Sequence, residues 1–204
     1  MSSVNYLMVT VAACDPSYVE QALQHVAGFA AELREKAGAI TARYGVVGTG
    51  ERAGSLVLFQ TYEELNGIDR AFKVYAESSD YQAVISSGKI SVTFRNIVKM
   101  EDLRLSNEST DTPAYGVVTR FASATPMTDR IQQFVPLFEA NGALVMRYGT
   151  LVTGSDAGKR WVGVTYPSMD AIEKTYDALR ASDAYKALMA DVQLDMRNIV
   201  RFVG

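Results

Sequence analysis

The same sequence pattern occurs twice in this chain. The stretch RYGVVGTGERAGS at residues 43–55 returns as RYGTLVTGSDAGK at residues 147–159, so that matching residues stand 104 positions apart. The tetrapeptide RNIV also occurs twice, at residues 95–98 and 197–200. Because repetition at a fixed spacing is the mark of repeated structural units, we expect two equivalent halves.

The limits of these halves follow from the repeat. The pattern extends over residues 4–99 and again over residues 114–203 of the 204-residue chain. Between them, residues 100–113 read MEDLRLSNESTDTP, which is polar and ends in proline. This composition is typical of a linker between folded units.

Each half has the pattern of a strand, a helix, two strands, a helix and a final strand. Alternating apolar residues at 5–13 predict the first strand. Asp15 and Pro16 are residue types that open helices, and Gly38 is typical of a helix end. The other elements expected in the first half are strands at 39–47 and 55–62, a helix with Leu65, Ile68, Phe72 and Tyr75 on one face, a short helix at 78–84 and a strand at 90–100. Their counterparts in the second half include a helix with Met169, Ile172, Tyr176 and Leu179 on one face, a short helix at 182–188 and a strand at 194–203.

The βαββαβ order predicts the fold class. It is the order of a ferredoxin-like unit, in which two helices cover one face of an antiparallel sheet. A single half would leave the other face of its sheet bare, whereas two halves can cover each other. The sequence therefore predicts an α+β protein in which two ferredoxin-like repeats form one intramolecular, pseudo-dimeric α+β barrel.

A short helix of the type Ser-x-x-Tyr precedes the last strand of each half, from Ser78 to Tyr81 and from Ser182 to Tyr185. With this feature, each half resembles the dimeric α+β barrel superfamily, which includes antibiotic-biosynthesis monooxygenases, muconolactone-isomerase-like proteins and stress-responsive barrel proteins. The resemblance extends over nearly the whole chain. The resemblance implies a barrel that two chains form in most members of the superfamily and that this single chain would form alone. In monooxygenases of this superfamily the substrate supplies the electrons, and Asn, Trp and Arg side chains position it.

Composition excludes several classes of function. The 20 basic and 23 acidic residues give a net charge of -3, and no cluster of Lys and Arg is present, so nucleic acid is not expected as a partner. The N-terminal sequence has no basic leader and no apolar run is long enough to span a membrane, which together with the single Cys14 indicates a cytoplasmic protein. His25 is the only histidine, so we expect no metal site and no haem ligated through histidine, as occurs in some members of the superfamily.

Four arginines recur between the halves. Alternation along the last strand separates Arg95 from a neighbouring apolar face, and that apolar face is expected to pack on the helices. Arg95 and its counterpart Arg197 would then point toward the opposing sheet. By the same alternation, Arg43 and Arg147 are expected to face the barrel interior.

The expected barrel brings these arginines into pairs. The second and fourth strands of a ferredoxin-like sheet lie at opposite edges, and an edge of one half would meet an edge of the other. Arg43 is therefore expected near Arg197, and Arg147 near Arg95. Buried guanidinium groups need counter-charges, for which Asp195 is the obvious strand residue. Alternatively, the arginines lay their stems on apolar surface and direct the charge to water.

Two hypotheses of function remain. In the first, the protein binds or transforms a small apolar or aromatic molecule between each sheet and its helices, without a cofactor, as a monooxygenase or an isomerase. In the second, it is a non-catalytic barrel that acts through structure or protein contact. Further association into a homodimer is compatible with both. The ligand-binding candidates are Arg43, Arg95, Asn96, Arg147, Trp161, Asp195, Arg197 and Asn198. The aromatic residues expected to line the cavity are Phe59, Phe72, Tyr75, Phe94, Trp161 and Tyr176.

Overall fold

The computed structural model describes residues 3–204. The first half consists of β1 (Tyr6–Cys14), a 3-10 turn (Pro16–Tyr18), α1 (Val19–Ala37), β2 (Thr41–Val47), β3 (Leu56–Tyr62), α2 (Leu65–Glu77), α3 (Ser79–Ser86) and β4 (Ile90–Met100). The second half consists of β5 (Tyr115–Ala122), α4 (Thr128–Gln132), α5 (Val135–Ala140), β6 (Val145–Leu151), β7 (Arg160–Tyr166), α6 (Met169–Ala181), α7 (Asp183–Asp191) and β8 (Gln193–Phe202).

The helical segment that follows the first strand differs between the two halves. Gly38 ends α1 in the left-handed conformation, which confirms the predicted end of the helix. Asp15 accepts a hydrogen bond from the Ser17 backbone N–H and caps the 3-10 turn, so α1 itself begins later, at Val19, than Asp15 and Pro16 predicted. In the second half this single helix is replaced by α4 and α5. Pro136 lies in the first turn of α5, where it cannot continue a helix from α4 because its ring would clash with the preceding turn.

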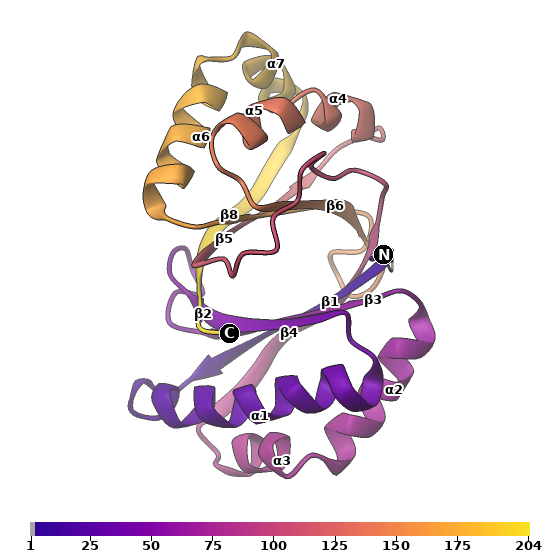
Figure 1. Cartoon of the computed structure of the whole chain (residues 1–204), viewed down its shortest axis with the longest axis vertical. Coiled ribbons are helices and arrows are strands. Elements are labelled where there is room, and N and C mark those ends of the chain that lie inside the picture. Colours follow the sequence, from indigo (N-terminus) through magenta and orange to yellow (C-terminus); the bar gives the residue numbers. More distant parts are fainter. Residues whose placement is uncertain (1–2) are drawn as a thin grey trace.

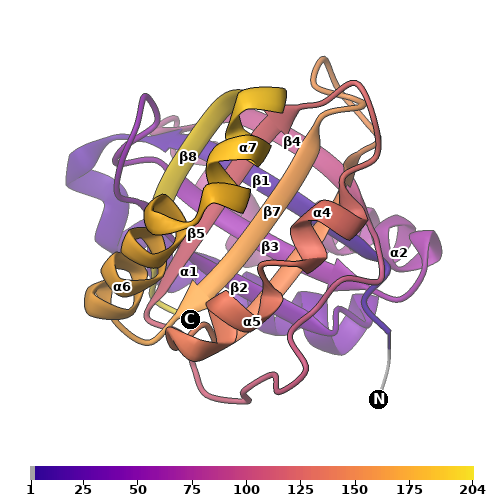
Figure 2. The same cartoon turned by 90° about the horizontal axis from the view of Figure 1, so that it is seen from above.

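All eight strands form one closed antiparallel barrel. Their order around the ring is β1, β3, β2, β8, β5, β7, β6, β4. The halves meet where β2 pairs with β8 and where β4 pairs with β6, and we call these two places the seams. Figure 1 shows the two sheets facing each other, with the helices of each half on the outer side, and Figure 2 shows the same arrangement from above. The expected meeting of sheet edges is confirmed.

Two repeated glycines allow the strands to approach at the seams. Gly45 lies opposite Phe202 in the first seam, and a Cβ atom on it would lie 2.0 Å from the Arg201 carbonyl oxygen. Gly149 occupies the corresponding place in the second seam, where a Cβ atom would lie 2.3 Å from the Lys99 carbonyl oxygen. The glycine of each RYG sequence is therefore required for barrel closure.

The RNIV sequences also belong to the seams. The Ile97 backbone N–H donates to Thr153 Oγ1 at 2.8 Å, and the Ile199 backbone N–H donates to Thr49 Oγ1 at 2.8 Å. Each RNIV sequence thus binds the threonine of the Thr-Gly turn in the opposite half. This reciprocal contact explains in physical terms why the RNIV sequence and the Thr-Gly turn each occur twice.

Apolar side chains fill three layers. The two outer layers pack the helices of each half against their own sheet. The middle layer lies inside the barrel and contains side chains from both halves, among them Val9, Val57, Val118 and Val200. Each sheet is therefore covered on both faces.

The segment between the halves packs on the second half. Leu103 and Leu105 are 1% and 2% exposed and join the core beneath α4 and α5. The Ser109 backbone N–H also donates to the Leu144 carbonyl oxygen at 2.9 Å. Residues 100–113 are thus fixed against the fold along part of their length. Among the described helices, none combines the length and the apolar character needed to cross a bilayer.

The prediction for the faces of the last strands is wrong for the residues after the β-bulge at Thr93, whereas Ile90 and Val92, before the bulge, lie on the helix side as expected. Arg95 lies on the helix side of its sheet, whereas Phe94 and Val98 belong to the apolar layer inside the barrel. Arg197 likewise lies on the helix side. The reason is that the barrel interior is as apolar as the space beneath the helices, so the more apolar face of a strand does not identify the helix side.

Candidate functional site

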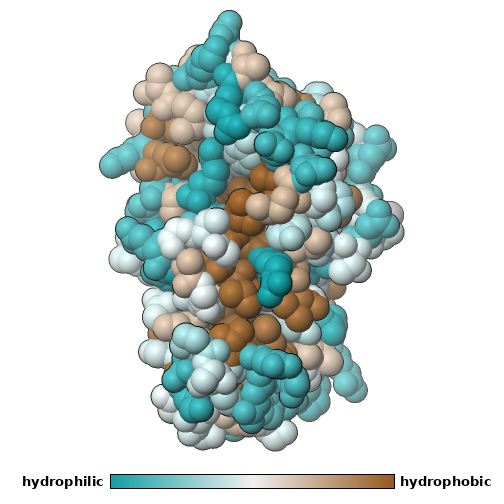
Figure 3. Space-filling model, turned by 90° about the vertical axis from the view of Figure 1, so that its left-hand side faces the viewer, coloured by the Kyte–Doolittle hydropathy of each residue, from teal (hydrophilic) through white to brown (hydrophobic). Residues whose placement is uncertain are grey.

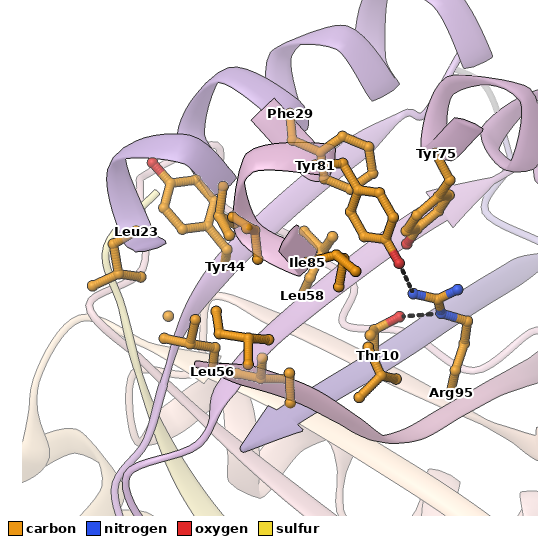
Figure 4. Close-up of a pocket in the computed structure, with 17 residues that line it drawn as sticks. Thr10, Leu23, Phe29, Tyr44, Leu56, Leu58, Tyr75, Tyr81, Ile85 and Arg95 are labelled. Atoms are coloured by element: carbon orange, nitrogen blue, oxygen red, sulfur yellow. Dashed lines mark hydrogen bonds between the residues drawn. The ribbon is translucent and has the colours of Figure 1, made fainter. Parts of the chain in front are cut away.

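A small pocket lies between the sheet of the first half and helices α1 and α3 (Figure 4). Its volume is about 50 Å³, and apolar side chains such as Leu23, Phe29 and Ile85 form most of its wall. Arg95 supplies the charged group of this wall. Figure 4 shows its guanidinium group close to the hydroxyl groups of Thr10 and Tyr81. The pocket therefore combines an apolar volume with one fixed cation.

Three residues hold the Arg95 guanidinium group in place. Its Nε donates to Thr10 Oγ1 at 3.2 Å, and its Nη2 donates to the Tyr81 hydroxyl oxygen at 3.3 Å. Its Cζ atom lies 4.4 Å from the centroid of the Tyr75 ring, within the range of a cation–π contact. We call Thr10, Tyr75, Tyr81 and Arg95 the first arginine–tyrosine cluster.

The second half contains the same arrangement. Arg197 Nε donates to Thr119 Oγ1 at 3.2 Å, its Nη2 donates to the Tyr185 hydroxyl oxygen at 2.7 Å, and its Cζ atom lies 4.8 Å from the Tyr176 ring centroid. The adjacent pocket has a volume of about 60 Å³. We call Thr119, Tyr176, Tyr185 and Arg197 the second arginine–tyrosine cluster.

The ring beneath each arginine comes from a different turn of its helix. At the repeat spacing, Tyr75 on α2 corresponds to Leu179 on α6, and Tyr176 corresponds to Phe72. Phe72 is 48% exposed, so it does not line the first pocket as expected. The two clusters therefore place an aromatic ring beneath the arginine from non-equivalent positions.

The charge of each cluster is uncompensated. Neither Arg95 nor Arg197 forms an ion pair with any carboxylate in the described part of the chain. Burial raises the pKa of Tyr75 and of Tyr176, and the adjacent guanidinium group opposes this shift only in part. Both phenols are therefore neutral at neutral pH, and each pocket presents a net positive charge to a ligand. A guanidinium group in such a place favours an anionic or enolic oxygen.

Comparison with known sequences places the chain in a family. A family model described as a domain of unknown function, DUF6854, matches residues 4–100 and, separately, residues 113–202. The chain belongs to the DUF6854 family. No curated protein matches it.

Solved structures share the fold of this DUF6854 protein. A "putative monooxygenase" from Fusobacterium nucleatum is 13% identical with a TM-score of 0.67, over 100% of this chain and 94% of that one. A chlorite dismutase mutant from Candidatus Nitrospira defluvii, in complex with cyanide, is 10% identical with a TM-score of 0.67, over 100% and 92% of the chains. A "putative monooxygenase" from Lactobacillus acidophilus is 9% identical with a TM-score of 0.61, over 98% of this chain and 94% of that one. At these identities the similarity shows the fold alone.

Asn96 and Asn198 of the DUF6854 chain lie at the seams. In the amide orientation that satisfies its neighbours, Asn96 Nδ2 donates to the Thr153 carbonyl oxygen at 3.2 Å. Asn198 donates to the Thr49 carbonyl oxygen at 3.2 Å in the same way. These asparagines reinforce the contacts between the RNIV sequences and the turns of the opposite half, away from both arginine–tyrosine clusters.

Asp195 binds two other cations instead of the repeated arginines. It pairs with Lys159 at 3.1 Å and with Arg120. Burial raises the pKa of the Asp195 carboxyl group. The hydrogen bonds from Lys159 and Arg120 lower it by more, so this pKa lies below its ordinary value. The expected approach of Arg43 to Arg197 is also wrong, because β2 pairs with β8 only through Gly45–Val47 and Val200–Phe202. The approach of Arg147 to Arg95 fails for the equivalent reason at the other seam.

Three other candidates lie together inside the barrel. Arg43, Arg147 and Trp161 line a cavity of about 260 Å³ at one end of the barrel. The expected interior placement of the two arginines therefore agrees with the structure. Phe59 lines the same cavity, and Phe94 lies deeper in the barrel, so neither of these aromatic residues belongs to a pocket beneath the helices.

The two threonines of the arginine–tyrosine clusters were not recognised from the sequence. Thr10 and Thr119 are 109 positions apart, whereas the next two strands of each half, β2 and β3 against β6 and β7, repeat at 104 positions. A comparison without gaps therefore misaligns β1 and β5. The repeated pair of Tyr81 and Tyr185, which does keep the 104-residue spacing, was the available signal for this site.

A haem ligated through histidine does not fit the pockets of this DUF6854 chain. His25 lies on α1 with its Nδ1 atom 2.9 Å from Asp80 Oδ1 on α3. It lines neither of the pockets beneath the helices. The imidazole therefore has no access to the space in which a ligand would bind.

Proposed function

We propose that this DUF6854 protein binds and transforms a small apolar or aromatic molecule in the pockets beside the two arginine–tyrosine clusters, without a cofactor. The ligand would carry one acidic or enolic oxygen. The observation that carries the proposal is the uncompensated guanidinium group in an otherwise apolar wall, present in both halves.

The hydrogen bonds of the cluster define what it can do to a ligand. The Tyr81 hydroxyl oxygen accepts from Arg95, which leaves its own hydrogen available to donate to a ligand oxygen. The Tyr185 hydroxyl has the same arrangement with Arg197. Such a pair of donors stabilises an enolate or phenolate. This supports an isomerase that moves a proton through an enol, or a monooxygenase in which the bound enolate supplies electrons to dioxygen.

The volumes of the pockets favour a second candidate function. Cavities of about 50 and 60 Å³ are smaller than the roughly 300–1,000 Å³ of typical ligand sites. On this basis the clusters would complete the packing of a non-catalytic barrel that acts through structure or protein contact. A ligand would enter only if side chains such as Ile85, which is 37% exposed, moved aside.

A thermal-melting screen against phenols, quinols, lactones and aromatic acids distinguishes the two functions. A ligand present at about 100 times its dissociation constant should stabilise the protein by about 2.7 kcal/mol, which corresponds to a shift of several degrees. The double variant R95M/R197M should remove this shift, because the methionine side chain retains the apolar stem and loses the charge.

The matched control is the variant Y81F/Y185F. It keeps both rings and both arginines but removes the hydroxyl groups, so it should bind the ligand and lose turnover. The catalytic proposal is refuted if no compound shifts the melting temperature of the parent protein, or if R95M/R197M responds as the parent does. Either result would favour the non-catalytic barrel.

We also infer that the two halves arose by duplication of one ferredoxin-like unit. The separate matches of the family model, the shared strand order and the equivalent seam glycines support this history. In this view one chain builds the barrel that two chains form in most members of the superfamily it resembles.

A further inference from the structure

The cavity inside the barrel is separate from both arginine–tyrosine clusters, because it lies on the opposite face of the sheets. Residues from both halves enclose it, and Glu108 and Ser109 of the segment between the halves contribute to its wall. Arg43 on β2 and Arg147 on β6 occupy equivalent positions in the repeat. Their strands stand on opposite sides of the ring of eight, so the cavity is lined by a guanidinium group from each side.

One of these arginines already holds a carboxylate. Arg147 Nη1 donates to Glu108 Oε1, and its Nη2 donates to Glu108 Oε2 at 2.9 Å. This is the two-pronged geometry by which arginine recognises carboxylates. The position of Arg147 on its strand is therefore suited to binding a carboxyl group at the end of the barrel.

Arg43 has no such partner. In residues 3–204 its guanidinium group forms no ion pair, and the charged group that acts on it is the cation Arg34, which itself donates to the Ala42 carbonyl oxygen. Burial lowers the pKa of Arg43, and the positive charge of Arg34 lowers it further. A guanidinium group nevertheless remains charged at neutral pH. The half-buried charge of Arg43 is thus uncompensated within the described fold.

A second polar group in the cavity also lacks a partner. In the first half, the Oγ1 atoms of Thr61 and Thr41 lie 2.7 Å apart in a hydrogen bond. Val145 stands at the position of Thr41 in the second half, and the buried Oγ1 atom of Thr165 has no hydrogen-bond partner among the described residues. Since a buried unsatisfied hydroxyl is costly, a rotation of the Thr165 side chain that turns Oγ1 toward a ligand in the cavity gains a hydrogen bond without breaking one.

The remaining wall of the cavity is mainly apolar. Phe59, Trp161 and Phe202 are among its residues. We propose that the cavity binds a small organic carboxylate, with its carboxyl group paired to Arg43 and within reach of Thr165, and with its apolar body against these aromatic rings. A volume of about 260 Å³ suits a compact acid and not a long lipid chain.

Trp161 provides a direct test, because it is the only tryptophan of the chain and it lines the cavity. Its fluorescence would be followed while the full-length protein is titrated with hexanoate and benzoate, and with the neutral amides hexanamide and benzamide. We expect a saturable change with the carboxylates and none with the amides. R43M should weaken binding by about 10- to 100-fold, as for the loss of one charged hydrogen-bonding partner.

Two further variants keep the test decisive if R43M folds poorly. T165V removes a hydroxyl that has no protein partner, so it should fold as well as the parent and bind the carboxylate severalfold more weakly. E108Q removes the competing negative charge at the cavity and should bind more tightly. R95M/R197M should bind as the parent does, which separates this site from the proposed function of the pockets beneath the helices.

Three results would overturn the proposal. They are the absence of a saturable change for both carboxylates with the parent protein, equal binding of carboxylates and amides, and binding that T165V and E108Q leave unchanged. Loss of binding in R95M/R197M with normal binding in R43M would instead assign the carboxylate to the arginine–tyrosine clusters.

Discussion

Buried tyrosine hydroxyl groups distinguish the two halves at the level of single residues. In the first half, Tyr62 donates to Gln60 Oε1 at 2.8 Å, and Gln60 Nε2 donates to the Tyr75 hydroxyl oxygen at 2.6 Å. Val164 stands at the position of Gln60 in the second half, and the Tyr166 hydroxyl has no hydrogen-bond partner within residues 3–204. The second half therefore contains polar groups whose burial reduces stability.

Tyr148 gives a pH-dependent prediction at this scale. Burial raises the pKa of its hydroxyl to about 12, and the nearby carboxylate of Glu101 adds to the shift. The unfolded chain loses this proton near pH 10, so the contribution of Tyr148 to stability is complete below pH 10 and is lost as the pH rises to about 12. Urea unfolding of the parent protein at pH 8 and pH 11 should show this loss.

The variant Y148F isolates that effect. Its side chain cannot ionise, and it removes a buried hydroxyl that has no partner among the described residues. We expect unchanged or slightly higher stability at pH 8, by up to about 1 kcal/mol, and a smaller loss at pH 11. An equal loss in Y148F and the parent would show that other groups cause the alkaline destabilisation.

At the scale of the elements, the seams determine whether the barrel closes. Gly45→Ala and Gly149→Ala each place a Cβ atom against a carbonyl oxygen of the partner strand, at 2.0 and 2.3 Å. The strands would have to separate, so we expect each variant to lose about 3 kcal/mol or more of the free energy of unfolding. Urea denaturation measures this loss.

Gly48→Ala is the matched control for these variants. It lies in the same region of the first half, and its Cβ atom would meet the Ile199 carbonyl oxygen at 3.3 Å, a contact that a shift of a few tenths of an ångström relieves. Its loss should stay below about 1 kcal/mol. Similar losses in all three variants would mean that barrel closure does not depend on close approach at Gly45 and Gly149.

The elements also show what the sequence could predict. The end of α1 and the meeting of sheet edges followed from a capping glycine and from strand order, which are local or topological properties. Which face of β4 lies toward the helices could not be predicted, because apolar side chains cover both faces of each sheet and alternation alone does not distinguish the two faces. The clusters around Arg95 and Arg197 were missed for the same reason, and because the 109-residue offset of β1 and β5 concealed Thr10 and Thr119.

At the scale of the whole molecule, the interior layer joins the two halves. If residues 1–100 and 101–204 are produced as separate polypeptides, each alone exposes its side of the layer that contains Val57 and Val200. We expect the two fragments to assemble when mixed and to recover the circular dichroism of the intact chain. Their melting temperature should rise with concentration, because folding then depends on association. Independent folding of each fragment as a monomer would contradict this dependence.

The outer surface of the molecule is uneven in polarity. Figure 3 shows an apolar stripe over the side where β2 and β8 meet. A shallow depression at this seam is lined by Val46, Tyr115, Met169 and Ile199, with Arg201 beside them. The first seam is thus apolar on its outer side as well as within the barrel.

The closed ring of strands has a consequence for how these molecules meet one another. An open sheet ends in a row of unpaired backbone groups, and such a row can recruit a strand from another chain and start aggregation. Here every strand within residues 3–204 has a neighbour on both sides, although each seam joins only three residues of each strand, so no strand is left without a partner along the whole of one edge. A second chain that adds a strand would therefore have to do so at the short unpaired stretches beside the seams, so the few residues that close each seam also limit how copies of the protein can join through their backbones.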